Sequence, residues 1–207
     1  MDGYRTIRTA ASAEFVEKKS RFIGHICPVT TQEEANEFIR QKKSEYWDAT
    51  HNVYAYVLRE GQTRRYSDDG EPQGTAGIPT LDVLLKEELT DCVVVVTRYF
   101  GGTLLGTGGL VRAYSHGSKI AVDAGGIVTM ALCAQLEIVC DYTFYGRLAA
   151  LIPEMGGVVE DTQFADAVTV CCKMPTSLVD AFDAKLFDQS LGKYRSRKIS
   201  ESFSAID

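Results

Sequence analysis

The sequence predicts an α+β protein of two domains, residues 1–127 and 128–207. Two observations support this prediction. A strongly amphipathic helical pattern at residues 110–124 stops at Gly125-Gly126, and paired glycines both end helices and suit a domain boundary. Beyond that point the strand and helix patterns follow the order β-α-β-β-α-β, which is the order of the ferredoxin-like fold. The length of 207 residues allows each domain a core of its own.

Hydrophobic periodicity predicts the elements of the first domain. Alternation with period two predicts strands, and apolar residues three and four apart predict helices. Residues 13–28 show a weak alternation interrupted by Lys18-Lys19-Ser20, which predicts two extended segments. The other predicted elements are a helix from Thr30 or Thr31 to about Tyr46, strands at 51–59 and 92–97, a turn at 59–65, and helices at 77–91 and 110–124.

The second domain has a shorter and more regular succession of elements. Leu136, Ile138 and Cys140 alternate along its first strand, and Gly156-Gly157 end its first helix. The predicted elements are strands at 130–142, 158–163, 167–173 and 194–203, with helices at 143–155 and 175–191.

Composition and charge restrict the class of protein. The net charge is −6, so a surface for nucleic acid must be a local basic patch. None of the six cysteines forms a C-x-x-C pair or lies near a histidine at zinc-finger spacing. This usage predicts a reducing cytoplasm, no disulfide framework and no metal site. The sequence contains no signal-peptide pattern and no apolar run long enough for a membrane helix. We therefore expect a cytoplasmic protein without a cofactor or membrane contact; the sequence makes no prediction of oligomeric state.

Two loops within residues 66–114 are unusual for an ordinary core. The acidic loop contains Ser67, Asp68, Asp69 and Glu71. Downstream, the buried strand at 92–97 runs directly into an arginine, two aromatic residues and a glycine-rich loop that opens a helix. Amides at such a turn bind phosphate, arginine pairs with it, and aromatic rings stack on bases. The candidate residues for binding nucleic acid or another anion are Arg64, Arg65, Arg98, Tyr99, Phe100, Gly101, Gly102, Gly106, Gly108, Gly109, Arg112, His116 and Lys119.

Each of these features also has a purely structural interpretation. The glycines can form a tight turn, and they match neither nucleotide fingerprint, because Thr107 stands where a P-loop has lysine. Arg98 can pair with the acidic loop instead of a ligand. Arg112, His116 and Lys119 can form a solvated helix face. The acidic loop lacks the EF-hand pattern and favours turn chemistry over a metal site, and no catalytic triad pattern is recognisable.

Two long motifs resemble a known family. The first is YSDDGEP followed by GTAG within residues 66–77, and the second is VTRYFGG at 96–102 followed by LGTGGLVRAY at 105–114. In order and spacing they closely resemble the IMPACT (YigZ) family in its bacterial two-domain form. The resemblance implies a ribosomal protein S5 domain 2-like fold for residues 1–127. For residues 128–207 it implies a ferredoxin-like fold similar to a domain of elongation factor G. Both folds recur in translation proteins.

The resemblance also implies a role in translation. It implies that eukaryotic relatives regulate translation initiation by binding an activator of an initiation-factor kinase. They do so through the shared domain and an extra N-terminal domain, which is not expected here. We therefore expect a non-enzymatic protein that acts in translation regulation by binding RNA, the ribosome or a translation factor. Two alternatives stay open: an enzyme that uses the loop at 101–109 on a phosphorylated or nucleotide substrate, and a protein–protein interaction module.

Overall fold

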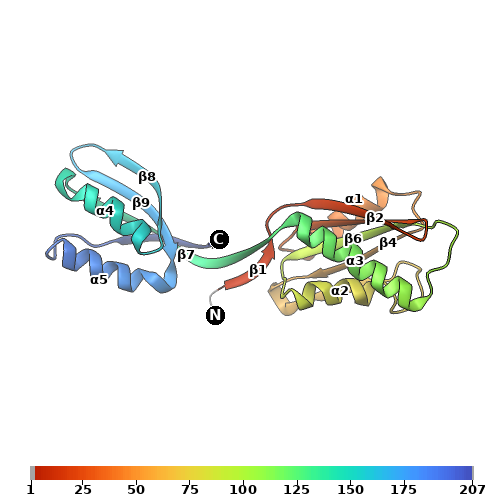
Figure 1. Cartoon of the computed structure of the whole chain (residues 1–207). Coiled ribbons are helices and arrows are strands. Elements are labelled where there is room, and N and C mark those ends of the chain that lie inside the picture. Colours follow the sequence, from red (N-terminus) through yellow and green to blue (C-terminus); the bar gives the residue numbers. More distant parts are fainter. Residues whose placement is uncertain (1–2, 207) are drawn as a thin grey trace. The chain divides into compact units, whose positions relative to one another are not determined.

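The computed structural model describes residues 3–206 and confirms the α+β class. The chain divides into two compact units (Figure 1). One unit is Tyr4–Thr129, and the other runs from Met130 to the end of the described range and also includes Gly3. None of the described helices is both long and apolar enough to cross a membrane.

The first unit is built around a five-stranded antiparallel sheet in the order β2-β3-β6-β4-β5. Its central strand, β6, is buried from Cys92 to Arg98, which explains its continuous apolar sequence. The strands are β2 (Ala11–Glu17), β3 (Ser20–Pro28), β4 (His51–Val57), β5 (Arg64–Ser67) and β6 (Cys92–Tyr99).

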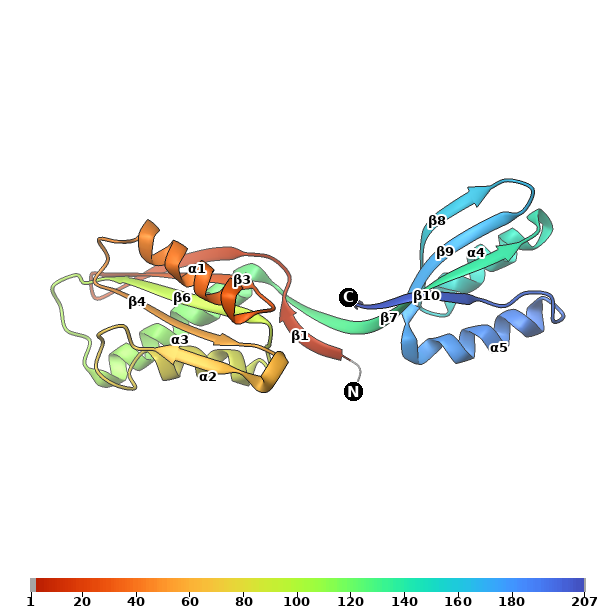
Figure 2. The same cartoon turned by 180° about the vertical axis from the view of Figure 1, so that it is seen from behind.

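Helices cover both faces of this sheet. Figure 2, turned by 180° from Figure 1, shows α1 in front of the sheet and α2 and α3 behind it. Alternate residues of β6 therefore enter two cores: Val94 packs in the cluster that contains Tyr114 of α3, and Val95 packs in the cluster that contains Ile39 of α1. The helices are α1 (Gln32–Glu45), α2 (Gly77–Lys86) and α3 (Thr107–Gly125).

Two local predictions in this unit are wrong. Residues 59–65, predicted as a turn, contain the 3-10 helix η1 (Glu60–Gln62) and lead into β5, an exposed edge strand without apolar alternation. The helix predicted at 77–91 ends at Lys86, because Glu88 adopts a left-handed backbone conformation with φ of 56° that a helix cannot continue through.

The second unit confirms the predicted order β-α-β-β-α-β. Its strands are antiparallel in the order β10-β7-β9-β8, which is the split β-α-β arrangement. Leu148 of α4 and Phe182 of α5 share one core with Leu136 of β7. These elements are β7 (Ile127–Cys140), α4 (Tyr142–Glu154), β8 (Val158–Phe164), β9 (Val168–Pro175), η2 (Thr176–Leu178), α5 (Val179–Gln189) and β10 (Arg197–Ala205).

The structure differs from the sequence prediction at two further places, the start of a helix in the second unit and a strand at the beginning of the described chain. The helix predicted to begin at residue 175 begins at Val179, because a 3-10 turn precedes it. A short strand, β1 (Gly3–Ile7), was not predicted. It is hydrogen-bonded to β7, and Ile7 is buried in the core of the first unit.

Candidate nucleic-acid interface

A buried ion pair joins the end of β6 to the acidic loop. Arg98 Nη1 donates to Glu71 Oε1 at 2.5 Å, and the hydroxyl of Tyr114 in α3 donates to the same oxygen at 2.7 Å. The side chains of Arg98 and Glu71 are only 6% and 4% exposed. Burial, aided by the charge of Glu71, raises the pKa of Tyr114 above its ordinary value, so the hydroxyl stays protonated as a donor.

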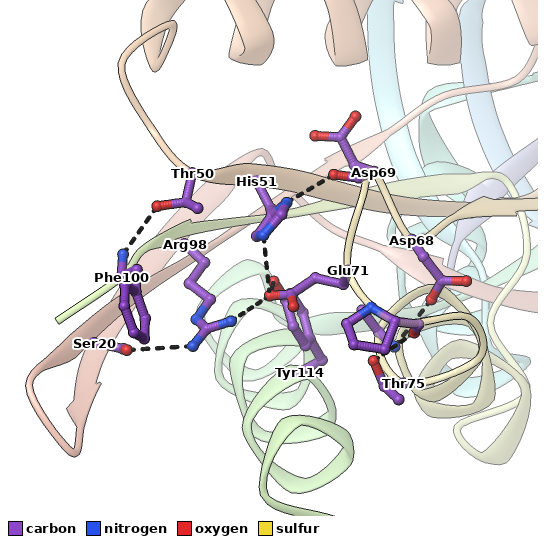
Figure 3. Close-up of polar contacts among 12 residues, drawn as sticks. Ser20, Thr50, His51, Asp68, Asp69, Glu71, Thr75, Arg98, Phe100 and Tyr114 are labelled. Carbon is purple, nitrogen blue, oxygen red and sulfur yellow. Dashed lines mark hydrogen bonds and ion pairs between the residues drawn. The ribbon is translucent and has the colours of Figure 1, made fainter. Parts of the chain in front are cut away.

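Two aromatic rings lie close to the guanidinium of Arg98, and Figure 3 shows one of them, the ring of Phe100. The guanidinium carbon lies 5.5 Å from the ring centroid of buried Phe22 and 5.4 Å from that of exposed Phe100. Arg98 Nη2 also reaches the hydroxyl of Ser20 at 3.5 Å. Arg98 Nη1 and Nη2 therefore have partners within the protein, whereas the buried Nε has none among the described residues, and the charge of Arg98 is balanced by Glu71 of the acidic loop.

Asp68 fixes the acidic loop to the start of α2. Its carboxylate accepts hydrogen bonds from the backbone N–H groups of Gly74, Ala76 and Gly77, at 2.9, 3.0 and 2.7 Å. The first amides of a helix have no partner within the helix, so an upstream carboxylate satisfies them. Burial alone works to raise the pKa of Asp68, but these three donors outweigh it and hold the pKa below its ordinary value.

We expect the contribution of Asp68 to be lost in acid. Because its pKa is lower in the folded protein, its contribution is present above the ordinary value of 3.8 and disappears as pH falls through the folded value. Urea unfolding of Asp68→Asn and wild type, at pH 7 and near pH 3, measures this. The wild type should be more stable than the variant at pH 7, and the gap should narrow near pH 3. A gap independent of pH would contradict the assignment.

Asp69 connects the acidic loop to β4 and α1. Its carboxylate accepts from the backbone N–H of Asn52 at 2.7 Å and from Lys43 at 2.5 Å, and its backbone oxygen pairs with His51 Nδ1 at 2.8 Å. The hydroxyl of Ser67 accepts from the backbone N–H of Asp69 at 3.1 Å. All three carboxylates of the loop thus have protein partners. Within residues 3–206, no group of three or more acidic, histidine or cysteine side chains is placed to hold a metal ion.

The glycine-rich loop meets the hairpin between β2 and β3. A Cβ at Gly101 would lie 2.0 Å from the backbone C and O atoms of Lys19, so only glycine permits this approach. The hairpin turns through Lys18 and Lys19, which both adopt positive φ, 45° and 68°. At the other end of the loop, Gly106 caps α3 without a side-chain hydrogen bond, which leaves the first helical amides free of a capping side chain.

A groove of about 500 Å³ lies between this hairpin and α3. Lys18 and Arg112 line it, and exposed His116 packs against the half-buried ring of Phe15. Lys18, Lys19 and Arg112 are exposed and form no ion pair with any residue in the described part of the chain. The lining residues are Phe15, Val16, Glu17, Lys18, Leu105, Gly109, Arg112, Ala113 and His116.

The other cations predicted to bind the same ligand lie elsewhere or are paired. Arg64 and Arg65 are exposed on β5, at the edge of the sheet opposite β2. Lys119 bonds two acidic side chains, at 2.8 Å each. The Tyr99 hydroxyl donates to Asp48 at 2.8 Å. Among the predicted residues, the groove therefore brings together only one glycine of the loop, Gly109, with an arginine and a histidine of α3.

Sequence reasoning did not include Phe15, Lys18 and Lys19 among the site residues. The signal that was available is the lysine pair itself, which separates two extended segments. A two-residue hairpin normally favours asparagine and glycine at these positions, so a lysine pair there is unusual.

Comparisons with known proteins relate both units to described families. Residues 18–122 match the family model of the Impact N-terminal domain, and residues 138–193 match a domain of unknown function, DUF1949. The IMPACT family member YvyE of Bacillus subtilis (strain 168) is 38% identical, over 93% of this chain and 89% of that protein. The IMPACT family member YigZ of Escherichia coli (strain K12) is 34% identical, over 93% of this chain and 97% of its own.

More distant and structural matches agree with these. The Protein IMPACT of Rattus norvegicus is 29% identical, over 47% of this chain and 32% of that protein. A solved structure, described as a crystal structure of an hypothetical protein, is 32% identical with a TM-score of 0.61 and covers 98% of this chain and 100% of its own.

Proposed function

Because this chain belongs to the IMPACT family, we propose that it acts in translation in the cytoplasm by binding RNA, not by catalysis. The translation part of the proposal rests on the family resemblance. The RNA part rests on the groove between α3 and the β2–β3 hairpin, which offers cations, an aromatic ring and helix amides at one place on the surface.

One observation carries the proposal: two unpaired cations, Lys18 and Arg112, line this groove, and a third, Lys19, follows Lys18 in the hairpin turn, on a chain with a net charge of −6. Most basic side chains of the first unit are neutralised by acidic neighbours; Arg21 and Arg98 are examples. Lys18, Lys19 and Arg112 are not, so their attraction for phosphate is not screened by a bound carboxylate.

The backbone of the hairpin supports a binding role for its lysines. The left-handed conformation costs a residue other than glycine about 1–2 kcal/mol, and both Lys18 and Lys19 adopt it. Asparagine and glycine would form the same type I′ turn with less strain. Strain of this kind is retained where the side chains are needed, so we assign the lysine pair to the ligand surface.

Replacing the pair by the sequence of an ideal turn tests this assignment without unfolding the protein. Lys18→Asn combined with Lys19→Gly should raise the free energy of unfolding by about 1 kcal/mol or more, because the turn is relaxed. The same variant should bind ribosomal RNA roughly tenfold more weakly, since two of about three phosphate contacts are removed. Filter binding of purified full-length protein to ribosomal RNA and to ribosomes measures the affinity, and urea unfolding measures the stability.

Salt dependence and a matched control complete the experiment. With about three phosphate contacts on a single strand, the logarithm of the affinity should fall with the logarithm of salt concentration with a slope of about −2. The hairpin variant should flatten this slope. Arg64→Ala with Arg65→Ala removes the same charge from the opposite edge of the sheet and should leave the affinity nearly unchanged. Absence of RNA binding, or equal loss in both double variants, would reject the proposed function.

A protein partner is the second candidate, favoured by exposed apolar side chains near the groove. Leu104 in the glycine-rich loop is 82% exposed, and Val16, which lines the groove, is 66% exposed. Such side chains are typical anchors of protein interfaces when they gather in one patch. Recovery of one protein in stoichiometric amount after nuclease treatment, together with failure to bind purified RNA, would favour this function.

A further inference from the structure

We infer that the groove between α3 and the β2–β3 hairpin binds one unpaired nucleotide of an RNA strand, with its base against Phe15 and its phosphate at Lys18 and Arg112. The inference rests on the proposed function and specifies which form of RNA the site takes. It concerns Phe15 of β2, which lies three residues before Lys18 and lines the groove.

The ring of Phe15 is held in place before any ligand arrives. It stacks on Phe22, with ring centroids 5.1 Å apart and an angle of 12° between the planes. Phe22 is fully buried and belongs to the core of the first unit. His116 of α3 packs against the same ring at 4.6 Å and 73°. A ring fixed by the core loses little entropy on binding, which is what a stacking platform requires.

The charged side chains in this groove can contact the phosphate, the ribose hydroxyls and the base amines of a nucleotide. Lys18 and Arg112 both line the groove, and each can donate hydrogen bonds to phosphate oxygens. Glu17 contributes a carboxylate to the same groove, and a carboxylate accepts hydrogen bonds from ribose hydroxyls or exocyclic base amines. Leu105 and Ala113 complete an apolar wall beside the ring. A groove lined by both cations and apolar side chains fits a nucleotide, with its phosphate and its base, better than a phosphate alone.

The size and position of the groove favour unpaired RNA over a duplex. Its volume of about 500 Å³ is that of a pocket for a small molecule rather than a channel for a helix. In A-form duplex RNA the base faces are stacked inside and out of reach, whereas bases of single strands and loops can be splayed onto aromatic side chains. Phe15 can therefore contact a base only where the RNA is unpaired, while Lys18 and Arg112 can contact phosphates of either form.

Binding of full-length protein to two matched ligands tests the inference. The ligands are a fluorescent single-stranded RNA of about twelve nucleotides and the blunt duplex of the same sequence. The affinity for the single strand should be at least about five times the affinity for the duplex. Phe15→Leu keeps an apolar side chain on Phe22 and should weaken only the single strand, by about fivefold or more. Phe15→Tyr restores the ring and should restore the affinity, and thermal unfolding checks that both variants are folded.

The outcomes separate this inference from the proposed function. The lysine-pair variant, Lys18→Asn with Lys19→Gly, is expected to weaken RNA binding. If it does so, but Phe15→Leu lowers the affinity for single strand and duplex equally, or lowers neither, the nucleotide inference is overturned and the proposed function stands. If the wild type binds neither ligand, both are rejected. Loss confined to the single strand in Phe15→Leu, with recovery in Phe15→Tyr, is the result that a purely structural role of Phe15 would not produce.

Discussion

Glu71→Ala is expected to lower the free energy of unfolding by about 3–5 kcal/mol, because it leaves the charge of Arg98 buried without a partner. The two side chains are 4% and 6% exposed and form a 2.5 Å hydrogen bond, so water cannot replace the lost carboxylate. The variant also removes the acceptor of the Tyr114 hydroxyl, a second buried group left unsatisfied. Urea unfolding followed by circular dichroism measures the change.

Two further variants separate charge from shape at this pair. Glu71→Gln keeps an acceptor oxygen for Tyr114 and removes only the charge, so it should lose less than the alanine variant. Adding Arg98→Met to Glu71→Ala should recover part of the loss, because no uncompensated charge then remains buried.

An exposed ion pair on α1 supplies the matched control for the Glu71 variants. Glu37 pairs with Arg40 at 2.5 Å, and both side chains are more than half exposed. Glu37→Ala should therefore change stability by only about 0–1 kcal/mol. If Glu71→Ala costs no more than Glu37→Ala, the buried pair does not stabilise the acidic loop as described here.

Gly101→Ala is expected to destabilise the first unit by about 3 kcal/mol and to weaken RNA binding at the same time. The added methyl would lie 2.0 Å from two backbone atoms of Lys19, and 2.6 Å from its Cβ. Backbone atoms cannot rotate away as a side chain does, so either the hairpin or the glycine-rich loop must move, at the cost of an overpacked site. Movement of the hairpin displaces Lys18 from the groove and shifts the neighbouring Lys19, which explains the expected loss of affinity.

Gly108→Ala is the control for Gly101→Ala. Gly108 lies in the first turn of α3, and a Cβ there would meet nothing nearer than Arg112 Nη1, at 3.8 Å. Alanine is favoured over glycine in a helix by about 1 kcal/mol, so this variant should be at least as stable as the wild type. Equal behaviour of the two alanine variants in unfolding and in RNA binding would show that the close approach at Gly101 is unimportant.

Much of the fold followed from local pattern. The alternation in β7, the helical spacing in α3 and the paired glycines after it depend on neighbouring residues, and these elements form as predicted with ends shifted by a few positions. Elements without such a pattern were missed. β5 is an exposed edge strand, so its four residues need no apolar alternation, and only its pairing with β4 makes it a strand.

Only the tertiary structure showed which candidate residues are paired within the protein and which are unpaired and can contact a ligand. Sequence reasoning identified Arg98 as a phosphate ligand or a partner of the acidic loop, and it had no means to choose between them. The choice depends on a contact with Glu71, 27 positions away, and on burial between two rings. Burial and charge pairing depend on which strands become neighbours, and local sequence does not specify this.

The sequence by itself therefore determined the α+β class, the order of the elements in the second unit, the two loops and the resemblance to the IMPACT family. The tertiary structure decided which cations of those loops are neutralised and which are available. It paired Arg98 with Glu71, and it brought Lys19 of the hairpin against Gly101, whose backbone N–H donates to Ser20 of the same hairpin, 81 positions away. Whether a cation is unpaired depends on which residues the fold places beside it. A cation that forms an ion pair with a carboxylate of its own protein attracts an anionic ligand less strongly than an unpaired one.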